Sequence, residues 1–174
     1  MFILSLDIAK TTGFAYGPAG SILRSGSVRL GDDPRSMCRN LLCFLREQFY
    51  VLSERPELVA VEAPLNAAAH QSGASIPYAF GGAHVADALC WAYGSRVEFC
   101  NVDQVRKHFI GKARTGNRNE TKRAVILRGV QLKYLPAGCR DDNRADACAL
   151  HDFASATFAR HVPSTLQMFG GNGQ

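Results

Sequence analysis

The chain has 174 residues, of which 47% are hydrophobic and 20% charged, as in a single soluble globular domain of ordinary size. These proportions exclude a fibrous or wholly disordered chain, and no stretch approaches the roughly 20 apolar residues of a membrane span. The formal net charge of +5 is compatible with a polyanionic partner but does not by itself require one.

The first 30 residues predict an antiparallel meander of strands. Residues 2–7 form a short, mostly apolar run that ends in Asp7, which is typical of a buried central strand. The turn residues and short spacings that follow predict hairpin connections. We expect a turn at Thr11-Thr12-Gly13, a strand over residues 13–17, a turn at residues 18–20 and a strand near residues 22–30.

The rest of the chain predicts helices that alternate with strands. Asp33-Pro34 is a suitable helix opening, and residues 36–53 contain neither Gly nor Pro and carry apolar residues at helical spacing. An apolar strand over residues 57–62 ends in Glu62, and small residues predict a loop over 66–73. The remaining expected elements are a helix at 76–93, a strand at 96–102, a helix at 103–109, a glycine-containing basic loop at 110–118, and helices at 119–134 and 142–159.

This order of elements predicts an α/β fold. Its central β-sheet is mixed, because an antiparallel meander is followed by parallel strands, and α-helices flank the sheet. No internal repeat or linker divides the chain, so we expect one domain over residues 1–160 and a flexible C-terminal tail over residues 161–174.

The cysteines and the N-terminus indicate the compartment. None of the six cysteines forms a CxxC pair, and several lie inside apolar runs, which favours buried free thiols in a reducing environment. The N-terminal run lacks basic residues and meets Asp7 after six residues, unlike a signal peptide. We therefore expect a cytoplasmic protein.

Basic residues are concentrated between Arg106 and Arg128. This segment holds eight basic residues against the single acid Glu120. It is either a phosphate-contacting surface or a solvated basic face, and charge alone does not separate the two. The candidate DNA-binding residues in it are Lys107, Lys112, Arg114, Arg118, Lys122 and Arg123.

Three acidic residues stand out because of the apolar elements that carry them. Asp7 ends the first strand, Glu62 ends a later strand just before Ala63-Pro64, and Asp146 lies on the apolar last helix. Each has an ordinary explanation by itself, such as a turn or cap residue for Asp7 and an ion pair with Arg144 or Arg140 for Asp146. Acids at strand ends and on a helix packed beside them would, however, converge on one point. Such a cluster repels itself unless cations neutralise it, and hard oxygen ligands favour Mg²⁺ or Mn²⁺.

Three motifs, taken in order, resemble those of the RuvC-type Holliday junction resolvases of the RNase H-like superfamily. The run Leu-Ser-Leu-Asp7-Ile-Ala-Lys-Thr-Thr-Gly is similar to their first-strand motif, and Val-Ala-Val-Glu62 is similar to their second. The segment Asp142-Asn143-Arg144-Ala145-Asp146 resembles the acid pair that opens their final helix. The resemblance runs from about residue 2 to residue 155.

The last motif departs from the common pattern. The common bacterial form has two aspartates three residues apart, whereas the residue three before Asp146 is Asn143. Asp142, four before Asp146, still shares its helical face. The fourth ligand is therefore Asp142, Asn143 or Asp141, and we take Asp142 as the candidate.

The resemblance implies a crossover junction endodeoxyribonuclease of DNA recombination and repair. It implies two-metal hydrolysis of phosphodiester bonds with Mg²⁺ or Mn²⁺, two ions per site. The metal ligands would be Asp7, bridging both ions, with Glu62, Asp142 and Asp146, and the catalytic set adds Lys122. It further implies branched DNA as substrate, a bacterial or phage-encoded protein, and a homodimer, because two opposed strands must be cut. Phe80, Trp91 and Tyr93 are candidates for the dimer face.

Other interpretations of the same residues remain open. A branch- or flap-cleaving enzyme, or a less selective DNA endonuclease of the same fold, would share the acids. A non-catalytic junction-binding module would keep the basic segment without needing the acids. The turn after Asp7 also resembles the phosphate-binding turn of actin-like sugar kinases, but 174 residues are too few for their two copies of the domain.

Overall fold

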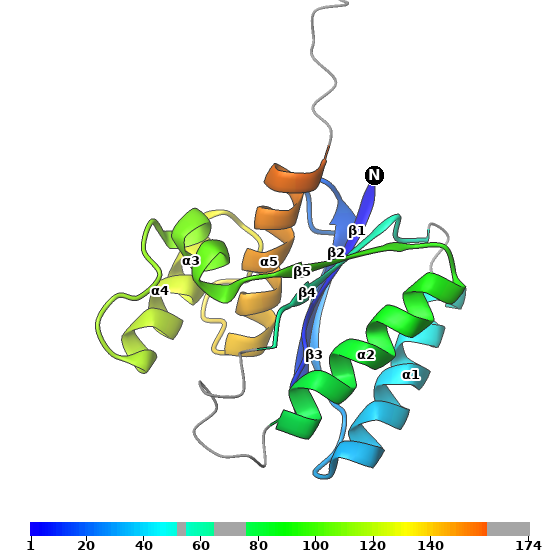
Figure 1. Ribbon diagram of the computed structural model, residues 1–174. Helices are drawn as coiled ribbons and strands as arrows, with labels where there is room; N and C mark the ends of the chain where they lie inside the picture. Colours follow the sequence, from blue (N-terminus) through cyan, green and yellow to red (C-terminus); the bar gives the residue numbers. More distant parts are fainter. Residues whose placement is uncertain (52–54, 65–75, 160–174) are drawn as a thin grey trace, which may run out of the picture.

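The computed structural model describes residues 1–51, 55–64 and 76–159, which form a five-stranded sheet between two layers of helices (Figure 1). The sheet order is β3-β2-β1-β4-β5. The strands are β1 (Phe2–Asp7), β2 (Thr11–Pro18), β3 (Arg24–Arg29), β4 (Leu58–Glu62) and β5 (Arg96–Cys100). The helices are α1 (Pro34–Val51), α2 (Ile76–Ala92), α3 (Val102–Ile110), α4 (Arg118–Gln131) and α5 (Asp142–Phe158).

The sheet is mixed, as the sequence predicted. Strands β1, β2 and β3 are antiparallel neighbours, whereas β4 pairs parallel to β1 and β5 pairs parallel to β4. Helices α1 and α2 cover one face and α5 covers the other, with α3 and α4 beyond it (Figure 1). The predicted fold class is therefore confirmed.

Side-chain alternation divides the apolar residues of β1 and β4 between two cores. Leu4 and Leu6 of β1 are fully buried with residues of α1 and α2. Ile3 of β1 and Ala60 of β4 point to the other face and are buried with α5. Successive residues of a strand point to opposite faces, so the odd-numbered residues of β1 and the even-numbered residues of β4 face α5.

Four expected boundaries were wrong, three of them because a polar side chain closes a turn or caps a helix. Thr11-Thr12-Gly13 is not a turn but the start of β2, because Thr12 Oγ1 donates to the Ala9 carbonyl oxygen at 2.9 Å and so closes the turn two residues earlier. Asn101 caps α3 ahead of Asp103, and Asn117 caps α4 in a capping box with Glu120. Helix α4 also ends at Gln131.

Other sequence expectations have mixed outcomes. All six cysteines are free, as predicted, but only Cys90, Cys100 and Cys148 are buried, and Cys43 is exposed. None of the helices in the described ranges combines the length and the apolar character that a membrane crossing requires. The loop expected over residues 66–73 and the tail expected over residues 161–174 lie outside the described residues.

Candidate active site

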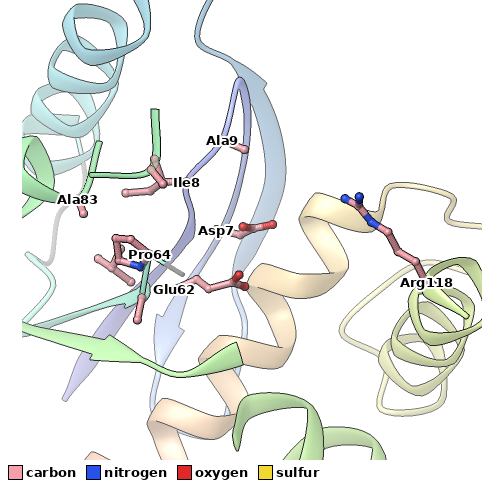
Figure 2. A pocket seen from close by; sticks show the side chains of 10 residues that line it. Asp7, Ile8, Ala9, Glu62, Pro64, Ala83 and Arg118 are labelled. Carbon is pink, nitrogen blue, oxygen red and sulfur yellow. The ribbon is translucent and has the colours of Figure 1, made fainter. Parts of the chain in front are cut away.

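Asp7 and Glu62 are brought together by the register of two parallel strands. The pairing of β1 with β4 runs from Ile3 opposite Leu58 to Leu6 opposite Val61. The same register places Asp7 beside Glu62, at the carboxyl ends of both strands, on the face that α5 covers. Figure 2 shows both side chains extending toward the ribbon of α5. The predicted convergence of these two acids is therefore present.

Helix α5 supplies the third acid, because its first turn is fixed onto β2 and β3. A Cβ on Gly13 would overlap the backbone carbonyl of Asn143, so α5 approaches β2 as closely as a glycine allows. Ser27 of β3 donates to Asp141 Oδ2 at 2.7 Å, and Arg144 Nε donates to Ser25 Oγ at 2.9 Å. These contacts fix the start of the helix that carries Asp146.

Burial and neighbouring carboxylates raise the pKa of all three acids. Burial raises the pKa of Asp7 well above its ordinary value, and the charges of Glu62 and Asp146 raise it further. Burial and the charge of Asp146 raise the pKa of Glu62 to about 7. Burial also raises the pKa of Asp146. The charge of Asp146 acts on both Asp7 and Glu62, so the three acids lie near one another.

Arg106 is the residue of this site that the sequence interpretation did not single out. Its Nη2 atom lies 3.9 Å from Asp146 Oδ2, and both side chains are largely buried, with 23% and 15% exposed. Its positive charge lowers the pKa of all three carboxylates against the effect of burial. The sequence placed Arg106 only within the basic segment and favoured its neighbour Lys107, which is exposed. An Arg among apolar residues of α3 was the available signal, since Val105 and Phe109 of the same helix are buried.

Lys122 and Asp142, both candidates from the sequence, contact each other. The Lys122 Nζ atom donates to Asp142 Oδ2, and this ion pair joins α4 to the first turn of α5. Lys122 lowers the pKa of Asp142, which is about one third exposed. Asp142 therefore lies at the rim of the cluster and is more exposed than Asp146.

Asp141, one of the two alternatives to Asp142, has other partners. Both carboxylate oxygens of Asp141 are engaged, Oδ1 with the Arg144 backbone N–H at 3.0 Å and Oδ2 with Ser27. Asp141 is the N-cap of α5, which gives it a structural role. Arg144 bonds to Ser25, while the ion-pair partner of Asp146 is Arg106 and not Arg144 or Arg140.

The candidate DNA-binding residues lie on α3, α4 and the loop between them. Lys107, Lys112, Arg114 and Arg123 are exposed. Arg118, at the start of α4, is also exposed and lines the cavity that contains Asp7 and Glu62. Figure 2 shows its side chain on the opposite side of Asp7 from Ile8 and Pro64. The exposed Arg118 thus supplies a positive charge beside the carboxylates.

The histidines stand apart from the carboxylates. His151 is buried on α5, with Nε2 at 3.3 Å from the Gly17 carbonyl oxygen, and burial lowers its pKa. His108 pairs with Asp152 at 3.0 Å. His84 is exposed on α2. His151 is thus a packing residue, and His108 and His84 are surface residues.

The donor set matches a hard divalent cation in its chemistry. Carboxylate oxygens are the ligands that Mg²⁺ and Mn²⁺ prefer, and a divalent cation would relieve the repulsion that raises these pKa values. As the side chains stand, no three His, Cys, Asp or Glu residues within residues 1–51, 55–64 and 76–159 are grouped closely enough to hold one ion. A bound cation therefore requires side-chain rotations that bring the carboxylates closer together.

The fold is that of RuvC-type, RNase H-like proteins. No protein-family model matches the sequence, and no curated protein matches it. Among solved structures, the chain is similar to Thermus thermophilus RuvC in complex with a Holliday junction substrate, with a TM-score of 0.69 and 16% identity over 89% of this chain and 93% of that one.

Two further solved structures have the same architecture. A second Thermus thermophilus RuvC structure has a TM-score of 0.64 and 19% identity, again over 89% of this chain and 93% of that one. The yeast mitochondrial Holliday junction resolvase Ydc2 has a TM-score of 0.64 and 10% identity over 88% of this chain and 77% of that one. The resemblance drawn from the motifs is thus matched by the fold of nearly the whole described chain.

Proposed function

We propose that this chain is a metal-dependent, structure-selective DNA endonuclease that resolves four-way junctions by nicking two opposed strands. The observation that carries the proposal is the convergence of Asp7, Glu62 and Asp146 from β1, β4 and α5. Buried acids whose pKa values are raised destabilise the fold at neutral pH, so a cluster of this kind indicates a functional site. The fold shared with the RuvC structures supports the choice of substrate.

Asp7, Glu62 and Asp146 would hold divalent cations, with Asp142 completing the set from the rim. Bound Mg²⁺ or Mn²⁺ supplies Lewis acidity and activates water for attack on phosphorus. Asp7 would bridge the two ions, as the resemblance of its first-strand motif implies. Arg106 forms an ion pair with Asp146 and offsets part of the negative charge.

The basic residues would orient the DNA strand over the carboxylates. Arg118 lines the cavity on the side opposite Ile8, where it can bind a non-bridging phosphate oxygen. Lys122 lies one turn later on α4 and pairs with Asp142. We propose that its positive charge stabilises the negative charge that develops on the phosphate during hydrolysis. Lys107, Lys112, Arg114 and Arg123 would contact phosphates farther along the strands.

Paired nicking requires two active sites, and we propose that a homodimer provides them. Trp91 of α2 is 82% exposed and Phe80 of the same helix is 36% exposed, which is unusual for large aromatic side chains. Helix α2 belongs to the layer of helices on one face of the sheet (Figure 1). We assign this face of α2, with Tyr93 just beyond its end, to the contact between protomers. Trp91→Ala should shift the mass measured by light scattering from dimer to monomer, whereas a mass already monomeric in the wild type would remove this assignment.

The test of the activity is cleavage of a labelled, immobile four-way junction with and without Mg²⁺ or Mn²⁺, beside linear duplex, flap and the Asp7→Asn variant. We expect paired nicks near the crossover that need the metal and disappear in the variant. Equal cutting of flap or linear DNA would replace the proposal with a less selective endonuclease of the same fold. Tight junction binding with no cutting under either metal would leave a binding module.

A further inference from the structure

Ser5 is a polar residue in the core between the sheet and α5. It lies in the middle of β1, and its side chain is fully buried. Its Oγ atom has no hydrogen-bond partner among the described residues. A buried hydroxyl group without a partner is costly, because it has given up its hydrogen bonds to water. An alanine at this position would avoid that cost, so packing alone does not account for a serine.

The strand pairing places Ser5 next to the carboxylates, on the same face of the sheet. Ser5 lies opposite Ala15 of β2 and Ala60 of β4. These flanking alanines have no polar group in their side chains. Successive side chains of a strand alternate between faces, so the next side chain of β1 on the face that α5 covers is the carboxylate of Asp7. The unpaired hydroxyl group and the first acid of the site are therefore neighbours.

The Ser5 hydroxyl group is within reach of the Asp7 carboxylate once that side chain turns. Residues two apart in a strand are separated by about 6.6 Å. The two side chains, turned toward one another, leave a gap close to the length of a hydrogen bond. Asp7 must move in any case to hold a cation, because no three candidate ligands in the described ranges are grouped closely enough to share one. A carboxylate that binds a cation still has lone pairs that can accept a hydrogen bond.

We infer that Ser5 is a positioning residue, whose hydroxyl group donates a hydrogen bond to the Asp7 carboxylate in the conformation that holds a divalent cation. The inference rests on the proposed metal-dependent function and adds the residue that orients one of its ligands. One rotation of Asp7 gives the hydroxyl group the partner that it lacks and directs the carboxylate. Hydrogen bonds to a ligating carboxylate hold it in the orientation that the ion requires.

A matched control separates this role from an ordinary role in packing. Ser95 is also buried, but its Oγ donates to the Pro56 carbonyl oxygen at 2.7 Å. It lies just before β5, at the end of the parallel strands opposite to the carboxylates. Ser95→Ala therefore removes a hydrogen bond that the metal-free protein already has. Ser5→Ala removes one that forms only with the cation.

The experiment measures Mn²⁺ binding to the full chain without DNA, by electron paramagnetic resonance of the free ion. We expect Ser5→Ala to bind Mn²⁺ at least about tenfold more weakly than wild type, and Ser95→Ala to bind it as wild type does. In EDTA, Ser95→Ala should unfold at a lower urea concentration than wild type, whereas Ser5→Ala should not. Equal Mn²⁺ affinity in Ser5→Ala and wild type would overturn the inference and leave the proposed nuclease intact. Absence of Mn²⁺ binding by wild type would remove both.

A metal titration of junction cleavage distinguishes a positioning residue from a catalytic one. Ser5→Ala should need about tenfold more Mg²⁺ than wild type for half-maximal cleavage. At saturating Mg²⁺ its rate should approach that of wild type, because the cation itself then holds Asp7 in place. A rate that stays low at saturating Mg²⁺, with an unchanged half-maximal concentration, would contradict the assignment.

Discussion

Arg106 and Asp146 form an ion pair at 3.9 Å between α3 and α5, beneath the cluster of carboxylates. Arg106 Nε has no hydrogen-bond partner although it is buried. An uncompensated buried polar group is costly, so the side chain is not held there for stability alone. Its charge acts on Asp7 and Glu62 as well as on Asp146. The pair therefore links the basic segment to the acids.

Replacing Arg106 should affect catalysis far more than replacing its exposed neighbour Lys107. We expect Arg106→Met to lower the single-turnover rate of junction cleavage by about 10²–10³-fold, because a fixed charge in the site is lost, and Arg106→Lys to restore part of it. Lys107→Met should weaken DNA binding and leave the rate at saturating protein nearly unchanged. Equal losses in the two variants would show that Arg106 has no special place among the basic residues.

The main features of the fold and of the acidic cluster could be predicted from the sequence. They depend on the spacing of apolar residues and on where the acids lie along the predicted strands and helices. Asp7 and Glu62 end strands whose apolar runs are easy to recognise, and Asp146 lies on a helix that is apolar on most sides. The beginning of β2 was misplaced because Thr12 closes its turn with a side-chain bond that a pattern of turn residues does not reveal. The spacing of apolar residues does not reveal Asn caps either, because a cap is a hydrogen bond between a side chain and the backbone.

What the sequence could not supply was the pairing of charged residues between elements. Arg106 and Lys107 are adjacent and chemically similar, and only the rotation of α3 against α5 decides which of them faces the acids. Asp141 and Asp142 differ in the same way, since one caps the helix and the other meets Lys122. The cavity was also inaccessible, because its apolar wall consists of small residues from separate segments.

The stability of the metal-free protein should fall as the pH rises through the range in which Glu62 ionises. The pKa of Glu62 is raised from 4.5 to about 7 in the folded state. The folded state therefore binds this proton more tightly, and the stabilisation that is full below pH 4.5 is lost by pH 7. Relative to Glu62→Gln, wild type in EDTA should lose free energy of unfolding on the order of 3 kcal/mol over this range. Urea unfolding at a series of pH values measures it.

Glu62→Gln is the matched reference for that measurement, because His151 responds in the opposite direction. Burial lowers the pKa of His151, so its contribution to stability rises as the pH increases. The difference between wild type and variant cancels this contribution. Mg²⁺ should raise the melting temperature of wild type at pH 7.5 and have less effect on Glu62→Gln. A difference between the two proteins that does not vary with pH would contradict the buried carboxylate.

Lys122 and Asp142 should act as a unit in a double-mutant cycle. Lys122→Met leaves the Asp142 carboxylate unpaired beside Asp146, and Asp142→Asn leaves the Lys122 ammonium without its partner. We expect each single variant to reduce cleavage and the double variant to lose much less than the product of the two effects. The coupling should amount to about 1 kcal/mol or more, as for residues in direct contact. Strictly multiplicative rates would mean that the ion pair has no part in the reaction.

The basic loop between α3 and α4 should determine the salt dependence of DNA binding. Lys112 and Arg114 are exposed there, and each phosphate contact contributes about 0.9 to the slope of log affinity against log salt. The double variant Lys112→Ala/Arg114→Ala should therefore reduce the slope by about two. Arg39→Ala serves as the control, because Arg39 is equally exposed but lies on α1, across the sheet. A slope reduced as much by Arg39→Ala would indicate a diffuse effect of net charge.

The approach of α5 to β2 should make Gly13 as important as an acid of the site, although it has no side chain. In Gly13→Ala the new methyl group would overlap the Asn143 carbonyl, so α5 must shift away from the sheet and carry Asp146 with it. We expect a loss of about 3 kcal/mol in the free energy of unfolding, at the upper end of overpacking effects. Cleavage should also slow at temperatures where the variant is still folded. Gly26→Ala on β3 is the control, because its methyl group meets only the Phe14 ring, which can move. If Gly13→Ala unfolds in urea at the same midpoint as Gly26→Ala and cleaves at the wild-type rate, then contact with β2 does not fix the position of α5.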